Sequence, residues 1–392
     1  MTRSVVVDAI RTPIGKFGGS LQSFSAPELG AIVIKELITR NKLPAERVDE
    51  CVMGNVITAG LGQNPARQAA IKGGLPDTVP CTTINKVCGS GLKAVMLVSD
   101  AILAGKAKMA VAGGMESMTN APYLLDRARY GYRLFDGKLI DAMVRDGLWD
   151  KFNDYHMGVT GEICADRHKV TREDADKFSA RSHRLALEAT ASGRFAKEIV
   201  QVKIEQKGQV QMVDKDEGPR ADSTAEKLAK LKPVFKDTGV VTAGNASSIN
   251  DGAAATLVVG EEDADSYSWG IAANIIDYIT VGTKPEWIME APIDAIEKLM
   301  GRNNLKVADI DLIEHNEAFA TASVAVQKKI GIPDEKFNIH GGAVALGHPI
   351  GASGARVLTT LLYSLDEKKA SRGIAALCLG GGEAVAMLVE RR

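Results

Sequence analysis

The sequence predicts an α/β fold made of two similar halves, with a long insertion in the first half. Short apolar runs alternate with segments whose apolar residues have helical spacing, which is typical of αβ units. The same order of runs returns after residue 270, and two glycine-rich turns recur at matching places. Such alternation favours parallel sheets with right-handed crossovers, and two halves of this kind can pack helix layer against helix layer.

The first half begins with an apolar strand and then alternates between helices and strands. Leu29, Val33 and Leu37 have helical spacing behind Ser25, which is a suitable N-cap. The expected elements are strand 4–9, helix 26–39, strand 50–56, helix 64–72, strand 82–84, helix 92–103, strand 109–112 and, after the insertion, strand 253–259.

The second half repeats this order. Its expected elements are strand 271–280, helix 293–300, strand 310–314, helix 318–329, strand 337–340, helix 355–365 and strands 374–379 and 384–389. Segment 91–93 (Gly-Leu-Lys) corresponds to 354–356 (Gly-Ala-Arg), and the pair 113–114 that ends strand 109–112 corresponds to 380–381. These matched turns favour a duplication over the alternative, which is that any αβ chain shows such an alternation of strands and helices.

The insertion, residues 119–246, differs in character from both halves. An aromatic-rich stretch leads to a charged helix, which begins at a capping box at 171–174 and ends at Gly193. After this helix we expect a surface hairpin formed by residues 199–204 and 209–213. We expect the insertion to cover the strand ends of the first half, where ligands of α/β folds bind. The expected domains are therefore 1–118 plus 247–269, the insertion, and 270–392.

Composition excludes several classes of protein. The chain carries 48 basic and 49 acidic residues, so nothing favours nucleic acid or an anionic membrane as a partner. Its five cysteines form an odd set without CxxC spacing, which argues against a disulfide framework and a zinc site and fits a reducing compartment. No apolar run reaches membrane-spanning length, and the early strand leaves no room for a targeting segment. We therefore expect a cytoplasmic protein; the alternative is a processed organellar protein, whose sequence would look the same.

Cys88 lies in the segment around which the chain is organised, 85–91 (Asn-Lys-Val-Cys-Gly-Ser-Gly). A strand leads into it and an apolar helix follows, so the cysteine is expected at the first turn of that helix. Free N–H groups and the helix dipole favour an anion there, which predicts a lowered pKa and a nucleophilic thiolate. The alternative is a small apolar residue that only fills space, and this segment alone leaves both interpretations open.

A second segment favours the interpretation of Cys88 as a nucleophile. Segment 347–354 (Gly-His-Pro-Ile-Gly-Ala-Ser-Gly) has the same pattern and carries His348 where the first carries Cys88. Cysteine with histidine is the arrangement for thiol nucleophilic catalysis. Asn316 could position the histidine or a water, Cys378 could act as acid and base, and the Gly380 N–H is a candidate oxyanion donor. The alternatives are a structural histidine, an N-cap asparagine and a strand-end cysteine.

Three further segments belong with these two: 316–319 (Asn-Glu-Ala-Phe), 378–382 (Cys-Leu-Gly-Gly-Gly) and the opening 8–13 (Asp-Ala-Ile-Arg-Thr-Pro). Together they resemble the signature blocks of the thiolases. The resemblance follows the family order over essentially the whole chain. It implies two βαβαβαββ halves in a layered αβαβα core with an inserted loop domain. It argues against ketoacyl synthases, which usually have two histidines, and against a non-catalytic acyl-CoA-binding relative, which we would expect to lack Cys88 or His348.

The resemblance implies a ping-pong Claisen reaction on coenzyme A thioesters without a further cofactor. Cys88 would become acylated with His348 as base, and Cys378 would remove the α-proton of acetyl-CoA. His348 with a water held by Asn316, and separately the N–H groups of Cys88 and Gly380, would stabilise oxyanions. The reaction would join two acetyl-CoA or split acetoacetyl-CoA. The alternative is a broader 3-ketoacyl-CoA thiolase of fatty-acid β-oxidation.

Substrate-binding residues follow from further similar blocks. Segment 155–158 (Tyr-His-Met-Gly) resembles the loop of short-chain members of the family, and 244–247 (Gly-Asn-Ala-Ser) resembles a pantetheine-binding segment. The residues implied to contact acyl-CoA or CoA are His156, Met157, Arg220, Phe235, Ala246, Ser247, Ala318 and Phe319. The family also suggests a homotetramer, with Phe135 among its contacts. The chain departs from the family pattern at Ile288 and at 290–292 (Glu-Ala-Pro).

Overall fold

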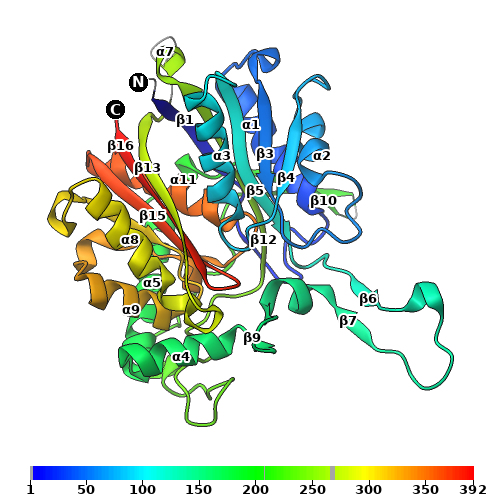
Figure 1. Ribbon diagram of the computed structural model, residues 1–392, viewed down its shortest axis with the longest axis vertical. Helices are drawn as coiled ribbons and strands as arrows, with labels where there is room; N and C mark the ends of the chain where they lie inside the picture. The colour runs from blue at the N-terminus through cyan, green and yellow to red at the C-terminus, as the bar shows by residue number, and fades with distance from the viewer. Residues whose placement is uncertain (1–2, 207, 265–269) are drawn as a thin grey trace.

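A single mixed sheet runs through both halves of the molecule (Figure 1). The computed structural model describes residues 3–206, 208–264 and 270–392, so the expected boundary at 269 lies outside the described residues. The first half holds β1 (Ser4–Arg11), β2 (Gly15–Lys16), α1 (Ala26–Arg40), β3 (Glu50–Gly54), α2 (Pro65–Lys72), β4 (Cys81–Ile84), α3 (Ser90–Leu103), β5 (Met109–Ser117) and β12 (Asn250–Gly260). The second half holds β13 (Ala273–Gly282), α8 (Ala291–Arg302), β14 (Leu312–His315), α9 (Ala320–Ile330), α11 (Ser353–Lys368), β15 (Arg372–Leu379) and β16 (Glu383–Arg391).

The strand order confirms the duplication. The sheet runs β14-β15-β16-β13-β1-β12-β5-β3-β4, so each half repeats one order outward from the central β1–β13 contact. That contact is short, with Val5 opposite Asn274 and Val6 opposite Ala273. The expectation of parallel sheets is wrong in part. Among the strands of this sheet that the structure describes, only β3, β4 and β5 and the β14–β15 pair run parallel, because the later strands of each half return antiparallel.

The predicted strand at 337–340 is also wrong. Phe337 makes one isolated parallel bridge to Ile313. The chain then turns at Asn338, which has a φ of 45°. The Asn338 amide replaces the missing ladder, because it accepts from the His315 N–H at 2.7 Å and donates to the His315 carbonyl at 2.9 Å. A side chain thus supplies the hydrogen bonds that a strand would have given.

Helices α3 and α11 form the central layer between the two halves of the sheet, with α1 and α2 on one outer side and α8 and α9 on the other. The two central helices touch at their first turns. A Cβ at Gly354 would lie 2.3 Å from the Leu92 nitrogen, and one at Gly91 would lie 2.7 Å from the Ala355 nitrogen. The repeated glycines predicted from sequence therefore allow a close approach of two backbones.

The second pair of repeated glycines has a different place from the one expected. Gly113 and Gly114 lie inside β5, which continues to Ser117. A Cβ at Gly113 would lie 2.2 Å from the Ala254 carbonyl oxygen, and one at Gly114 would lie 2.0 Å from the Gly351 carbonyl oxygen. These glycines do not end the strand. They let neighbouring backbone pack directly on it.

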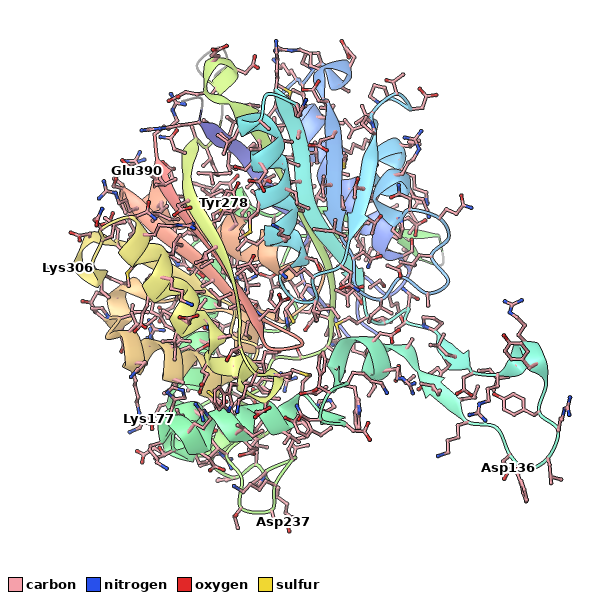
Figure 2. The ribbon with its side chains drawn as sticks, viewed as in Figure 1. Asp136, Lys177, Asp237, Tyr278, Lys306 and Glu390 are labelled. Carbon is pink, nitrogen blue, oxygen red and sulfur yellow. The ribbon has the colours of Figure 1, made fainter. Side chains whose placement is uncertain are left out.

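The insertion contains β6 (Tyr123–Leu125), β7 (Leu139–Asp141), β8 (Trp149–Asp150), β9 (Tyr155–His156), α4 (Gly158–His168), α5 (Arg172–Ala191), β10 (Val202–Gln206), β11 (Gln209–Val213) and α6 (Ala225–Leu228). The capping box at Thr171 is confirmed, and the chain leaves α5 through Gly193 at a φ of 73°. Strands β6 and β7 carry an arm that projects from the body, with Asp136 near its tip (Figure 2). Tyr130 and Phe135 on this arm are 86% and 88% exposed.

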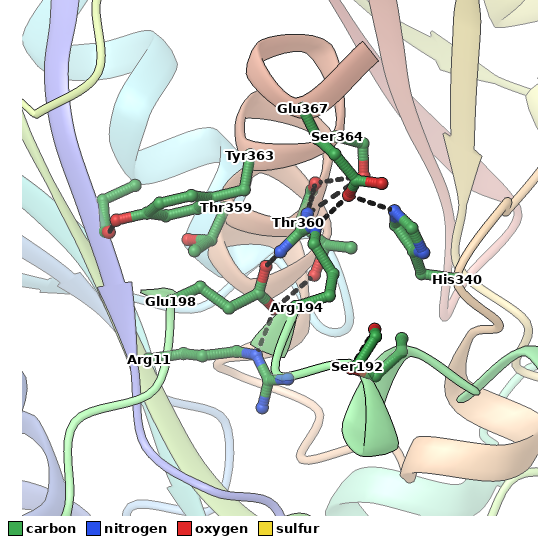
Figure 3. A network of polar contacts seen from close by, with 12 residues as sticks. Arg11, Ser192, Arg194, Glu198, His340, Thr359, Thr360, Tyr363, Ser364 and Glu367 are labelled. Atoms are coloured by element: carbon green, nitrogen blue, oxygen red, sulfur yellow. Dashed lines mark hydrogen bonds and ion pairs between the residues drawn. The ribbon is translucent and has the colours of Figure 1, made fainter. Parts of the chain in front are cut away.

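A buried ionic network joins the insertion to both halves (Figure 3). The Glu198 carboxylate forms ion pairs with the guanidinium groups of Arg11 of β1 at 2.6 Å and of Arg194 at 2.9 Å. Arg194 also pairs with Glu367 of α11 at 2.8 Å. Burial opposes ionisation of Glu198, but the two guanidinium groups outweigh it and lower its pKa to about 2. The network therefore holds the end of α5 against β1 and α11.

Replacing Glu198 by Gln should destabilise the protein strongly, because two buried guanidinium groups lose their shared carboxylate. Breaking a buried pair typically costs about 3–5 kcal/mol of unfolding free energy, seen as a lower urea midpoint. The folded-state pKa of Glu198 is depressed, so its contribution is full above the ordinary value of 4.5 and is lost as the pH falls toward about 2.

The matched control is Glu188→Gln. Its partner Arg184 lies 2.8 Å away in a pair whose side chains are 59% and 58% exposed. We expect this variant to unfold within about 0.5 kcal/mol of the unmodified protein. Equal stability of the two variants at neutral pH would contradict a stabilising role for the network.

Candidate active site

One cavity collects most of the residues predicted to carry the chemistry. Its lining includes Cys88, His348, Cys378 and Gly380, and also the predicted substrate residues His156, Met157, Phe235, Ala246, Ser247, Ala318 and Phe319. These residues come from both halves and from the insertion. The structure thus brings together Cys88 and Cys378, which are 290 positions apart in sequence (378 − 88).

The Cys88 turn is strained and tightly packed. Val87 has a φ of 46°, an uncommon value for a β-branched residue and one that persists only where surrounding contacts fix it. Ser90 holds the turn, since its hydroxyl accepts from the Lys86 N–H at 2.8 Å and donates to the Val87 carbonyl at 2.7 Å. A Cβ at Gly89 would lie 2.3 Å from Leu379 of β15. The turn is therefore pressed against the other half.

The predicted lowering of the Cys88 pKa is wrong. Burial raises the pKa of this thiol to about 12, although the N–H groups of Gly380 and Cys88 itself pull it down. The reason is position: α3 starts at Ser90 with Gly89 as its N-cap, so Cys88 precedes the helix. Desolvation then outweighs the nearby donors. Cys88 is a thiol at neutral pH, and it needs a base at the moment of attack.

His348 is oriented by its own loop. Its backbone N–H donates to Asn250 Oδ1 at 2.9 Å, and its ring Nδ1 lies 2.6 Å from the Ser353 hydroxyl. That hydroxyl donates its only proton to the Pro349 carbonyl at 2.8 Å, so it accepts from His348 Nδ1–H. The neutral ring therefore keeps a free lone pair on Nε2. Burial and the positive charge of Arg356 lower the pKa of His348 to about 3.

Glu116, which the sequence analysis did not single out, anchors this loop. It is fully buried at the end of β5. Its carboxylate accepts from Gly351 N–H at 2.9 Å and from Val56 and Ile57 N–H groups at 3.0 and 3.2 Å. One carboxylate thus ties the His348 loop to the end of β3. An acidic residue inside an apolar strand was the signal that could have identified it.

Asn316 lies behind His348. Its Nδ2 is 3.5 Å from both ring nitrogens of His348, and its Oδ1 is 3.5 Å from Arg356 Nη2. It is fully buried. The alternative of an N-cap is excluded, because Phe319 is the N-cap of α9. Asn316 is thus placed to orient the imidazole.

Cys378 is the second thiol of the cavity. It is buried near the end of β15, and its Sγ lies 3.9 Å from Met289 Sδ. Burial, and then the neighbouring Cys88, raise its pKa far above the ordinary thiol value. Gly381 and Gly382 follow with φ values of 89° and 85°, so the chain turns sharply beside the two thiols.

The predicted pantetheine segment forms one wall of the cavity. Ser247 N–H donates to the Ala318 carbonyl at 3.0 Å, and Ala246 bridges to Phe319. The His156 ring stacks on Phe235 with centroids 4.8 Å apart. Its Nδ1 accepts from the Gly158 N–H at 3.0 Å, so its neutral ring carries the proton on Nε2.

Arg220 does not line this cavity. It is exposed in a separate groove with Lys177 and Arg184, and its N–H donates to His183 Nδ1 at 3.1 Å. Within the described residues, no three His, Cys, Asp or Glu side chains are grouped as a metal site would require. In the same part of the chain, every helix is too short or too polar to cross a membrane.

Comparisons with known proteins agree on a family. The thiolase N-terminal domain model matches residues 4–262 and the thiolase C-terminal domain model matches residues 269–391. The acetyl-CoA acetyltransferase of Pseudomonas aeruginosa is 50% identical over 388 residues, which cover 99% of each chain. An acetyl-CoA acetyltransferase of Escherichia coli K12 is 51% identical over 392 residues, covering 100% of both.

A solved structure shows the same fold. The crystal structure of the Bacillus anthracis acetyl-CoA acetyltransferase superposes with a TM-score of 0.97 at 40% identity, covering 100% of this chain and 99% of that one. The duplicated αβαβα core, the cavity with two cysteines and a histidine, and both domain models lead to one conclusion: this chain belongs to the thiolase family.

Proposed function

We propose that this chain is an acetyl-CoA C-acetyltransferase, which joins two acetyl-CoA molecules into acetoacetyl-CoA and CoA and also catalyses the reverse thiolysis. The observation that carries the proposal is one cavity that holds Cys88, Cys378 and His348 together. The names of relatives that are about half identical over the full length support the choice of acetyl groups. Coenzyme A thioesters are the substrates, and no further cofactor is needed.

The first half-reaction loads the enzyme. Cys88 Sγ attacks the thioester carbonyl of acetyl-CoA while His348 Nε2 accepts the thiol proton. The carbon–sulfur bond to CoA then breaks, and Cys378 donates its proton to the departing CoA thiolate. The products are acetyl-Cys88, free CoA, an imidazolium and a Cys378 thiolate. The free lone pair on Nε2 suits His348 to this role.

The second half-reaction uses the charges left by the first. The Cys378 thiolate removes an α-proton from a second acetyl-CoA, and the enolate attacks the acetyl carbonyl on Cys88. Burial raises the pKa of Cys378, and a thiolate whose conjugate thiol has a high pKa is a strong base, as the weakly acidic α-carbon requires. Cys88 leaves as a thiolate and regains its proton from His348, so every group returns to its starting state.

Fixed donors would stabilise the two oxyanions. We assign the Cys88 and Gly380 N–H groups to the tetrahedral intermediate on acetyl-Cys88, and protonated His348 with a water held by Asn316 to the enolate oxygen. The Gly380 N–H already hydrogen-bonds to Cys88, which supports this assignment. Such donors act strongly in a cavity from which water is excluded.

The rest of CoA would extend outward from the cavity. Ser247 and Phe235 would contact pantetheine, while the exposed groove of Arg220 would receive the nucleotide phosphates. The exposed aromatic arm supports a homotetramer, because exposed apolar patches of this kind mark protein interfaces. All five cysteines are free, which supports a cytoplasmic location.

Brief exposure to acetyl-CoA should place one acetyl group on Cys88. Mass spectrometry of digested protein would locate the group, which Cys88→Ser should lack. Cys164→Ser is the matched control, because Cys164 is a buried cysteine outside the cavity lining, and it should acetylate normally. Acetylation of Cys88→Ser at another residue, with turnover retained, would refute the proposed intermediate.

Cys88 should show no thiolate at neutral pH. Thiolates absorb ultraviolet light more strongly than thiols, so the difference spectrum between the unmodified protein and Cys88→Ser reports this group. Because its pKa lies near 12, the thiolate signal should emerge only in strongly alkaline solution. A thiolate that titrates near or below neutrality would show instead that Cys88 is activated before substrate binds.

Met289 should limit the acyl chain, because it lines the cavity and contacts Cys378. In Met289→Gly, kcat/KM for a 3-ketoacyl-CoA two carbons longer should rise relative to acetoacetyl-CoA by roughly 10-fold or more. Met300→Ala removes a methionine from the same core outside the cavity and should leave the ratio unchanged. An unmodified enzyme that already prefers longer chains would favour the broader 3-ketoacyl-CoA thiolase.

A further inference from the structure

Cys51 and Cys81 face each other at the start of two neighbouring strands. They are direct partners in the parallel ladder of β3 and β4, and each thiol shifts the pKa of the other. Adjacent strands lie about 4.8 Å apart, which falls inside the Cα separations of about 4.4–6.8 Å that disulfides adopt. The acyl-transfer chemistry uses neither residue. The pair therefore needs its own explanation.

A fixed cation lies beside Cys81. Arg67 of α2 donates to the Asp77 carbonyl at 2.8 Å and to the Val79 carbonyl at 3.1 Å. The Cys81 thiol lies 3.3 Å from that same Val79 oxygen. The neighbouring Cys51 thiol lowers the pKa of Cys81, and Arg67 adds to this against the effect of burial. Cys81 is therefore the more easily ionised thiol of the pair.

The two thiols also differ in access. Cys81 is half-buried on β4, the edge strand, and lines an open surface groove with Asn64 and Pro65. Cys51 is buried behind it. The pair therefore combines an accessible sulfur of lowered pKa with a protected thiol directly opposite it in the ladder, which is the arrangement of an attacking and a resolving cysteine.

We propose that Cys51 and Cys81 form an oxidisable dithiol that closes to an intramolecular disulfide on contact with a peroxide. The Cys81 thiolate attacks one oxygen of hydrogen peroxide, the O–O bond breaks, and the released hydroxide takes a proton to become water. Cys51 sulfur then attacks the resulting sulfenic sulfur, the S–O bond breaks, and that hydroxide takes the Cys51 proton. The two thiols supply the two electrons that reduce the peroxide.

The test treats the purified full-length enzyme with one equivalent of hydrogen peroxide, alkylates the remaining thiols, and maps the digest by mass spectrometry. We expect a peptide pair joined through Cys51 and Cys81, and free thiols that fall from five to three per chain (5 − 2). Cys88 should stay alkylatable, and dithiothreitol should restore all five. Oxidation of Cys88 or Cys378 before Cys81, or no joined peptide, would overturn the proposal.

Two variants separate this pair from general oxidation. In Cys51→Ser the resolving thiol is missing, so Cys81 should accumulate as a sulfenic acid that dimedone captures, with no disulfide. Cys164→Ser lacks a buried thiol outside the pair and should form the Cys51–Cys81 link as the unmodified protein does. Melting curves establish that both variants are folded. A Cys51→Ser protein that loses two thiols at the normal rate would contradict the assigned partner.

Discussion

The close approach of α3 and α11 is the constraint on which the rest of the structure depends. Each helix starts just after a loop that carries chemistry, and Gly91 and Gly354 let their first turns touch. The loops before them, with Cys88 and His348, therefore open into one cavity. A duplicated fold explains why both loops have the same form, since each occupies the equivalent place in its own half.

Burial determines the chemistry of this cavity. It favours the neutral form of every reactive group, so the pKa of Cys88 rises and that of His348 falls, both mainly through desolvation. Charge then appears only as bonds change, where fixed donors such as the Gly380 N–H can stabilise it. The thiol at Cys81 shows the contrast, because the neighbouring Cys51 thiol and, to a smaller extent, the Arg67 guanidinium lower its pKa instead.

Local patterns were enough to predict most elements, the duplication and the reactive residues Cys88, His348 and Cys378, while the resemblance to the thiolases supplied the substrate-binding residues that meet them in the cavity. Contacts between distant segments could not be predicted in the same way. Asn338 replaces a strand through hydrogen bonds to His315, and Glu116 holds the His348 loop from another half. The Cys88 pKa depended on burial that no short motif reveals. The domain boundaries and the role of Arg220 stay predictions.

The most direct test of the helix contact is the rate of Cys88 acetylation in Gly354→Ala. The added methyl would meet the Leu92 backbone nitrogen at 2.3 Å, while Gly301→Ala adds a methyl with no atom within 4 Å and is the control. Displacing reacting groups by about 1 Å can cost roughly 100-fold in rate. We predict such a loss in Gly354→Ala, in a protein that still unfolds cooperatively but with a lower midpoint, and normal acetylation in the control. Normal acetylation in Gly354→Ala would contradict this account.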